Sequence, residues 1–229
     1  MGGSKKHRAH PDVPEQFGIT GFNSFASIDD VPEFLPDEKK GITGYKGWVL
    51  AKGRKPLRYN TAQDRDPLPD ELTADFRIKA LQQEHDEPFL ITLGIIRPHA
   101  PWHAPQSHFD KFPLDEIKKP PYLENDLDDT ADGLAQRYGK FRFEALKNSY
   151  EGDEGWRRWM QAYLACVSFS DAQIGRVLDA LDQSKYADNT IVVVTSDHGF
   201  HMGEKDQIYK KTVWEESTRV PLIIRMPDG

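Results

Sequence analysis

The chain has 229 residues, of which 38% are hydrophobic and 29% are charged. A chain of this length buries roughly 70% of the surface of its unfolded state, so it can form a real core in about one or two domains. Its net charge of −7 gives no support to a general nucleic-acid surface. No apolar run reaches the roughly 18 residues that span a bilayer, so we expect neither a nucleic-acid nor a membrane partner. The single cysteine, Cys166, excludes an internal disulfide framework and a cysteine-based zinc cluster.

Residues 1–70 are rich in Pro, Gly and Asp and contain only short apolar stretches such as GWVLA. We expect a loop-rich segment with short strands at best, lying over the active-site side of the molecule. Loops of this length are usually functional excursions or parts of a larger unit. The basic residues near the start are not followed by an apolar stretch, so the sequence predicts no secretory signal and leaves the compartment open.

The pattern sharpens over residues 71–229. A helix is expected from about residue 71, with Leu72, Phe76 and Leu81 at helical spacing and Thr73 as its cap. The run PFLITLGII at residues 88–96 is apolar without polar alternation, which is typical of a parallel strand covered on both faces.

A long helix is predicted at about residues 154–183 because apolar side chains recur at intervals of three and four. These are Trp156, Met160, Tyr163, Leu164, Val167, Ile174, Val177, Leu178 and Leu181. Two further buried strands are expected at residues 190–195 and 220–226. Strand, helix and strand at this spacing form a βαβ unit, so the predicted class is α/β, with part of a mainly parallel sheet flanked by helices.

Polar and charged residues follow two of the predicted strands directly. Arg97, Pro98, His99, Trp102 and His103 come after the first, and the stretch SDHGFHMGEK at 196–205 comes after the second. Ligands of open parallel sheets bind beyond the carboxyl ends of the strands, so the two segments together indicate one site for a charged group. For either segment alone, an ordinary solvated loop is an equally good interpretation.

Asp197 and His198 are adjacent candidates for metal binding. A carboxylate suits calcium or magnesium, whereas an imidazole suits zinc or manganese equally well, so Asp197 is the firmer ligand. Two ligands do not complete a metal site, and on residue types alone this motif is a weak signal.

Longer stretches carry a resemblance to a known family. SDHGFHMGEKDQIYKKTVWEESTRVPLIIRMP, PFLITLGIIRPHAPWHAPQSHFDKF and AYLACVSFSDAQIGRVLDALD occur in the order in which the sulfatase family has similar segments, most closely the branch that includes iduronate-2-sulfatase. The resemblance covers about residues 75–229 well. It implies a fold similar to alkaline phosphatase, hydrolysis of sulfate esters, a divalent cation that is usually calcium, and a formylglycine made from cysteine.

The resemblance also implies roles for individual residues. Asp197 and His198 match the family's metal ligands, Lys210 its sulfate-contacting lysine, and His99 its sulfate-binding histidine. Positive charge around the sulfate oxygens and help for the leaving alkoxide are what such a reaction needs, so His99 and Lys210 are the expected catalytic and substrate-binding residues. His103 either lines the substrate pocket or packs. Lys210 has the alternative of a solvated lysine, and His99 that of a plain loop histidine.

Other parts of the family pattern are missing. The Cys-x-Pro-Ser-Arg signature is absent, and Cys166 lies on the apolar stripe of the long predicted helix, as a small buried hydrophobe does. Asp29-Asp30 and Asp128-Asp129 do not follow an apolar strand, so neither replaces the family's paired metal ligands, and His7 and His10 do not match its spacing. The sequence thus resembles the middle of a sulfatase, truncated at both ends, with residues 71–229 as a partial catalytic domain.

The resulting prediction is a sulfuric ester hydrolase family chain for a sulfated carbohydrate or other small sulfate ester, inactive on its own. The alternatives are a phosphate or phosphonate ester hydrolase of the same superfamily, an inactive fragment, or a chain that needs a complementing fragment. All of this rests on one expected arrangement, in which His99, Asp197, His198 and Lys210 surround a single anion. Relatives of this kind are commonly exported, but the sequence assigns no compartment.

Overall fold

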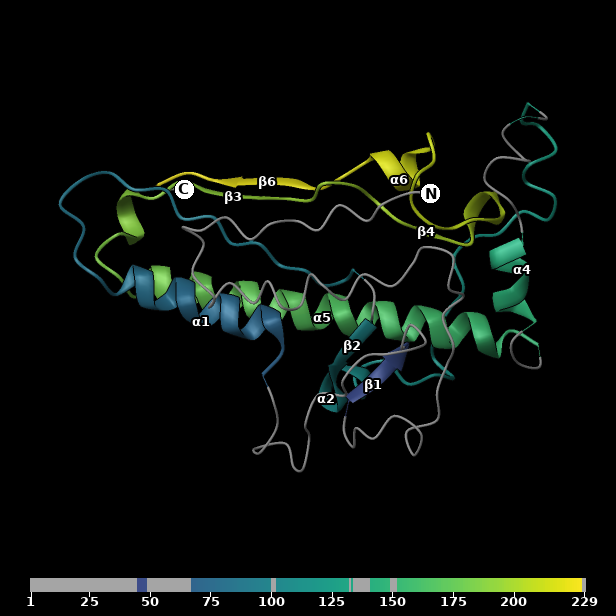
Figure 1. Ribbon diagram of the computed structural model, residues 1–229, viewed down its shortest axis with the longest axis horizontal. Helices are drawn as coiled ribbons and strands as arrows, with labels where there is room; N and C mark the ends of the chain where they lie inside the picture. The colour runs from purple at the N-terminus through teal and green to yellow at the C-terminus, as the bar shows by residue number, and fades with distance from the viewer. Residues whose placement is uncertain are drawn as a thin grey trace, which may run out of the picture.

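The computed structural model describes residues 45–48, 67–99, 102–131, 133, 141–148 and 152–227 (Figure 1). Its helices are α1 (Pro69–Leu81), α2 (Gln106–Phe109), α4 (Phe141–Lys147), α5 (Glu154–Asp182) and α6 (Glu215–Thr218), with 3₁₀ turns at Ala187–Asn189 and Glu204–Asp206. Its strands are β1 (Tyr45–Trp48), β2 (Trp102–Pro105), β3 (Val192–Thr195), β4 (His201–Met202), β5 (Ile208–Tyr209) and β6 (Leu222–Arg225). Within the described ranges, no helix combines the length and apolar composition needed to cross a membrane.

Helix α5 is the long element along which the others are arranged, as Figure 1 shows. The predicted helix at about 154–183 is confirmed, since α5 spans Glu154–Asp182. Its N-terminal half contributes to a group of fully buried rings that we call the aromatic cluster: Trp102, Phe143, Trp156, Trp159 and Phe169. Burying such large side chains supplies much of the favourable free energy of folding, so this end of α5 anchors the elements around it.

Helix α1 is confirmed, but its start and its buried face differ from the prediction. The helix begins at Pro69, and the backbone N–H of Leu68 donates to the Glu71 carboxylate at 2.7 Å. Thr73 lies inside the first turns, where its hydroxyl donates to Pro69 O at 3.0 Å, so the predicted Thr73 cap is wrong. Proline is tolerated at the first helical position because its missing N–H would have no intrahelical partner there. The helix can therefore begin at Pro69, upstream of the predicted start near residue 71. Leu72 is exposed.

The predicted strand at residues 88–96 is wrong, because this segment has no strand structure. A strand needs a hydrogen-bonded neighbour, and the described ladders join other segments. Ile91 and Leu93 still pack against a second hydrophobic cluster that includes Val177 and Leu181 of α5, whereas Leu90 is 87% exposed. The apolar run therefore has one covered side and one open side.

Three two-stranded ladders make up the described sheet structure, and each is antiparallel. The strands predicted at 190–195 and 220–226 are confirmed as β3 and β6, which pair from Val192↔Arg225 to Thr195↔Leu222. The burial predicted for them is wrong, because the described residues cover neither strand on both faces. This β3–β6 ribbon leaves Val193, Ile223 and Ile224 exposed. Mixed helix and sheet is confirmed, while the parallel pairing expected of residues 88–96 is not found among the described residues.

Most of the expected N-terminal segment lies outside the described residues. Only β1 and residues 67–70 of the range 1–70 are described, and β1 pairs with β2 from Tyr45↔Pro105 to Trp48↔Trp102. Asp29-Asp30, His7 and His10 therefore lie outside the described ranges. The division at residue 70 stays a prediction.

Candidate active site

The loop after β3 presents Asp197 and His198 at the surface. The Asp197 side chain is 85% exposed and the His198 side chain 30% exposed, with 3.5 Å between Asp197 Oδ2 and His198 Nε2. Gly199 follows at a point of very close backbone approach: a Cβ there would meet Glu216 O at 2.1 Å and Arg219 O at 2.9 Å. Only glycine fits this position without a shift of the backbone, so the residue after His198 can lie directly against the backbone at Glu216 and Arg219.

The contacts of His198 define its tautomer. Nδ1 lies 2.7 Å from Gly199 O, and because a carbonyl can only accept, Nδ1 carries the proton. Nε2 of the neutral ring then offers a lone pair, and Lys210 Nζ lies 2.5 Å from it. The ammonium of Lys210 thus donates to His198, with the Asp197 carboxylate beside the same ring atom.

Lys210 is partly withdrawn from solvent at this point. Burial lowers the pKa of Lys210, Asp197 raises it and neighbouring Lys211 lowers it. The result is a compact group of one cation, one imidazole and one carboxylate on adjacent loops. Such a group offers an ammonium to an anion, whereas the Nε2 lone pair of His198 can bind a cation together with Asp197 only when Lys210 does not donate to it.

His99 lies in the loop that precedes β2. Its backbone N–H donates to Ile96 O at 2.8 Å, which closes a turn over residues 96–99. The buried Asp70 carboxylate accepts from the backbone N–H of Ile96 at 2.7 Å and of Arg97 at 3.0 Å. Ser170 on α5 donates to Arg97 O at 2.9 Å, so two helices, α1 and α5, fix the start of this turn.

An aromatic contact joins the two loops. The Trp102 indole donates to Pro98 O, which folds the loop back on itself, and its ring lies 5.6 Å from the ring of Phe200, centroid to centroid. Phe200 is two residues beyond His198, so the loop that carries His99 adjoins the loop that carries His198. The structure brings Asp197, His198 and Lys210 into contact and packs Trp102, three residues after His99, against Phe200, two residues after His198. A four-residue arrangement around one anion stays a prediction.

His103 and Arg97 lie beneath the surface. The His103 side chain is only 9% exposed, and its backbone carbonyl accepts from Arg97 Nε at 3.2 Å. Burial favours packing for His103, and its proposed contact with substrate stays a prediction. Cys166 is fully buried, and burial raises the pKa of its thiol to about 12, in keeping with a packing role rather than a nucleophilic one.

Asp197 and His198 fit a divalent cation in the kind of donor atoms they offer. The carboxylate oxygen and the lone pair on Nε2 lie 3.5 Å apart, and the Nδ1–H donation to a backbone carbonyl is the arrangement that orients a metal-binding histidine. In the described ranges, however, no group of three or more His, Cys, Asp or Glu side chains is placed to hold a metal ion. The pair therefore supplies two donors of a site that needs others.

Sequence reasoning missed the residues that support these loops. Asp70 lies 26 positions from Ile96 along the chain, and its sequence context gives no sign of that contact. His201 was seen only as one member of a polar segment, yet it is fully buried and bonds Thr212. One sequence signal could have suggested this burial. His201 follows a predicted strand and lies among small and apolar residues.

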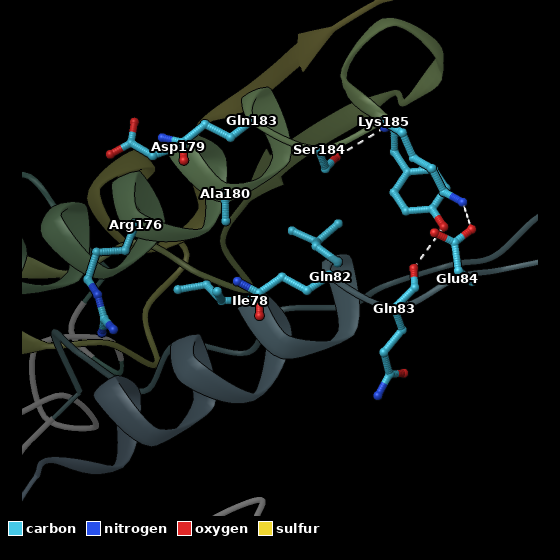
Figure 2. A pocket seen from close by; sticks show the side chains of 12 residues that line it. Ile78, Gln82, Gln83, Glu84, Arg176, Asp179, Ala180, Gln183, Ser184 and Lys185 are labelled. Carbon is cyan, nitrogen blue, oxygen red and sulfur yellow. Dashed lines mark hydrogen bonds and ion pairs between the residues drawn. The ribbon is translucent and has the colours of Figure 1, made fainter.

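A groove among the described residues lies away from the side chains of the candidate site. It has a volume of about 620 Å³ and runs between the C-terminal ends of α1 and α5, and Figure 2 shows the side chains that line it, among them Ile78, Arg176 and Gln183. Lys185 pairs with Glu84 across it, and Tyr186 donates to Gln83 O at 2.9 Å. Asp197, His198 and Lys210 do not line this groove, which is a gap between helix ends rather than part of the candidate site.

Known proteins match most of the chain. A family model described as Sulfatase matches residues 12–229. A sulfatase of Formosa agariphila is 38% identical over 94% of this chain and 47% of its own length. Human iduronate 2-sulfatase is 32% identical over 70% of this chain and 31% of its own length, so the chain spans less than half of these relatives.

Among solved structures, a phosphonate monoester hydrolase from Silicibacter pomeroyi matches with a TM-score of 0.57 at 24% identity, covering 93% of this chain and 41% of the other. This likeness concerns the fold alone, and it confirms the predicted α/β fold class. The match of the family model over nearly the whole length identifies the chain as a member of the sulfatase family.

Proposed function

We propose that the chain forms the part of a sulfatase active site that binds the sulfate group, with a sulfated carbohydrate as substrate. The observation that carries the proposal is the contact between Lys210 Nζ and His198 Nε2 at 2.5 Å, with Asp197 Oδ2 3.5 Å from the same ring atom. A sulfate monoester carries negative charge on its oxygens, so a partly buried lysine at the surface of a loop suits it. The name of human iduronate 2-sulfatase indicates a sugar sulfate for that relative.

Each side chain has a role in this proposal. Lys210 donates to a sulfate oxygen, and His99, from the adjoining loop, donates a hydrogen bond or a proton where charge develops on the leaving alkoxide. Asp197 and His198 hold a divalent cation, calcium by the family resemblance, together with donors from elsewhere. A cation bound there neutralises the sulfate oxygens.

The proposal also limits what the chain does alone. The 229 residues lack the Cys-x-Pro-Ser-Arg signature, and the thiol of Cys166 is buried, so we expect binding of a sulfate ester without turnover. A steady release of 4-nitrophenol from 4-nitrophenyl sulfate by the purified chain, lost in Asp197→Ala, would contradict this expectation.

Binding can be tested with two matched variants. Lys210→Gln removes the ammonium that contacts His198, whereas Lys211→Gln removes the same charge from the exposed neighbouring residue. A hydrogen bond to a charged group contributes about 1.5–3 kcal/mol, so Lys210→Gln should weaken binding of 4-nitrophenyl sulfate about tenfold to a hundredfold by calorimetry. Lys211→Gln should weaken binding much less. Equal losses of affinity in the two variants would mean that Lys210 acts only through the net charge of the chain, and would overturn the proposal.

Phosphate or phosphonate esters are the alternative substrates. The solved phosphonate monoester hydrolase supports only the fold, whereas the Formosa agariphila sulfatase and human iduronate 2-sulfatase match at higher sequence identity, so a sulfate ester is favoured. Competition calorimetry with phenylphosphonate and 4-nitrophenyl sulfate separates the two. Tighter binding of the phosphonate would reverse this preference.

A complementing polypeptide is a further part of the proposal. The β3–β6 ribbon exposes Val193, Ile223 and Ile224, and the chain spans 47% of the Formosa agariphila sulfatase. Large exposed apolar patches mark surfaces that another polypeptide covers. We therefore expect a polypeptide that supplies the remaining part of a sulfatase domain to bind this ribbon. Co-purification that is lost when Ile223 and Ile224 are changed to Lys would support it, and unchanged co-purification would contradict it.

A further inference from the structure

Lys210 lies between two residues with an unusual backbone conformation. Tyr209 has φ of 81° and Lys211 has φ of 77°, in the left-handed region that residues other than glycine rarely adopt. Such conformations persist only where the surrounding contacts impose them, and they concentrate at functional positions. The question is which contacts hold this segment.

On the N-terminal side of Lys210, a short hairpin fixes the chain. Strands β4 and β5 pair as His201↔Tyr209 and Met202↔Ile208. The Tyr209 ring lies 5.3 Å from the ring of Trp159 and 5.8 Å from that of Phe200, both edge-on. Tyr209 is therefore tied to the aromatic cluster on α5, directly before Lys210.

On the C-terminal side, one side-chain hydrogen bond fixes the chain. His201 is fully buried, with an exposure of 0%, and its Nε2 lies 2.6 Å from Thr212 Oγ1. The Trp214 ring lies edge-on to the imidazole at 6.0 Å. Because Thr212 is two residues beyond Lys210, this bond closes the segment 209–212 against β4.

We propose that His201 and Thr212 are positioning residues that hold Lys210 beside His198 and Asp197, where its ammonium can reach a sulfate oxygen. The inference rests on the proposed function of Lys210, but it assigns a role to two residues that do not touch the anion themselves. The buried imidazole faces away from solvent, so its contribution passes through the threonine hydroxyl. Without this bond, the segment 209–212 loses a contact that keeps Lys211 in its left-handed conformation, and Lys210 no longer stays beside His198.

The variants separate positioning from general stability. Thr212→Val removes the hydroxyl at nearly constant shape, and Thr212→Ser restores it. Ser168→Ala is the matched control, because Ser168 Oγ lies 3.0 Å from Nδ1 of His108, a histidine–hydroxyl pair on α2 and α5 away from Lys210. Thr212→Ala serves as a second variant should Thr212→Val not fold. Thermal unfolding by circular dichroism records the cost in stability for each.

The experiment measures affinity for 4-nitrophenyl sulfate by calorimetry and the imidazole ¹⁵N resonances of His198 by NMR. Thr212→Val should weaken binding about tenfold, the change expected from one hydrogen bond, and move the His198 Nε2 resonance toward that of Lys210→Gln. Thr212→Ser should restore both, and Ser168→Ala should change neither.

The outcomes distinguish this inference from the function on which it rests. If Lys210→Gln weakens binding while Thr212→Val binds as the unchanged chain does, the positioning role is wrong and the proposed function stands. If Lys210→Gln leaves binding unchanged, the proposed function is wrong. If Thr212→Val lowered the melting temperature but left the His198 resonance unchanged, Thr212 would have only a structural role, and the inference would be overturned.

Discussion

Two regions of the molecule bury their apolar side chains to very different degrees. Around the N-terminal half of α5, the aromatic cluster is closed, and the β4–β5 hairpin that carries Lys210 packs on it through Tyr209. Along the β3–β6 ribbon, Val193 is 56% exposed and Ile224 is also 56% exposed. The position of Lys210 therefore depends on the first region, whereas the second, whose strand β3 leads to Asp197 and His198, is an open surface in which fewer packing contacts can be lost.

The largest effect should come from a paired truncation in the two regions. Trp159 is 1% exposed and its ring lies 4.2 Å from that of Trp102, so Trp159→Ala should lower the free energy of unfolding by about 3–5 kcal/mol. Val193→Ala, on the ribbon, should lower it by less than about 1 kcal/mol because little surface is buried there. Urea unfolding followed by circular dichroism measures both. Equal losses would abolish the contrast between the regions.

A second comparison concerns Gly199, at the junction between the ribbon and the hairpin. An added Cβ would meet the backbone oxygen of Glu216 at 2.1 Å, so Gly199→Ala should destabilise the protein by about 1–3 kcal/mol and displace His198. Gly175→Ala is the control, since nothing lies within 4 Å of a Cβ there. In the middle of α5, alanine should stabilise by about 0.5–1 kcal/mol. If the free energy of unfolding changed in the same direction in both variants, the close approach at Gly199 would be contradicted.

Asp70 should matter for the loop of His99. Asp70→Asn replaces one of the two carboxylate oxygens that accept from Ile96 and Arg97 with an amide donor, so we expect a loss of about 1–3 kcal/mol. Asp75→Asn, which breaks a half-exposed ion pair with Arg176, should cost less than about 1 kcal/mol. Differential scanning calorimetry distinguishes them, and a neutral Asp70→Asn would mean that the loop is held by other contacts.

The smallest effect concerns acid stability near the hairpin. Burial lowers the pKa of His201, while Glu216 and Glu204 act in the opposite direction. Because the folded state resists protonation, the free energy of unfolding should be highest above the unfolded histidine pKa of about 6.5 and fall as the pH drops toward the lowered folded value. His201→Gln should flatten this fall, by about 1.4 kcal/mol for each unit of pKa difference. Parallel curves for the two proteins between pH 7.5 and 5.0 would refute the assignment.

Local periodicity and long-range pairing differ in how far the sequence reveals them. Helix α5 follows from the spacing of its apolar residues, because a helix satisfies its backbone hydrogen bonds within itself. The segment 88–96 has the composition of a buried strand, but a strand also needs a neighbour, and composition does not supply one. The predicted Thr73 cap was wrong because α1 begins upstream, at Pro69. The Glu71 carboxylate stabilises that start by accepting from the backbone N–H of Leu68.

The residues of the candidate site also differ in how far the sequence reveals them. Asp197 and His198 were indicated by their position after a predicted strand, and Lys210 by the family resemblance. The contact between His198 and Lys210 joins the two across twelve positions of sequence. Asp70, His201 and Thr212 act through tertiary contacts for which no motif exists in the sequence. Burial of His103 likewise follows from the packing of β2 rather than from its neighbours in the chain.

The central claim is that Lys210 and His198 form the place where a sulfate ester binds. A crystal of the chain soaked with 4-nitrophenyl sulfate, with anomalous diffraction from the ester sulfur, tests it directly. We predict a sulfur peak with a sulfate oxygen within hydrogen-bond distance of Lys210 Nζ, on the side of the loop that carries His99. A sulfur peak found in the groove between α1 and α5, with none beside Lys210, would contradict the claim.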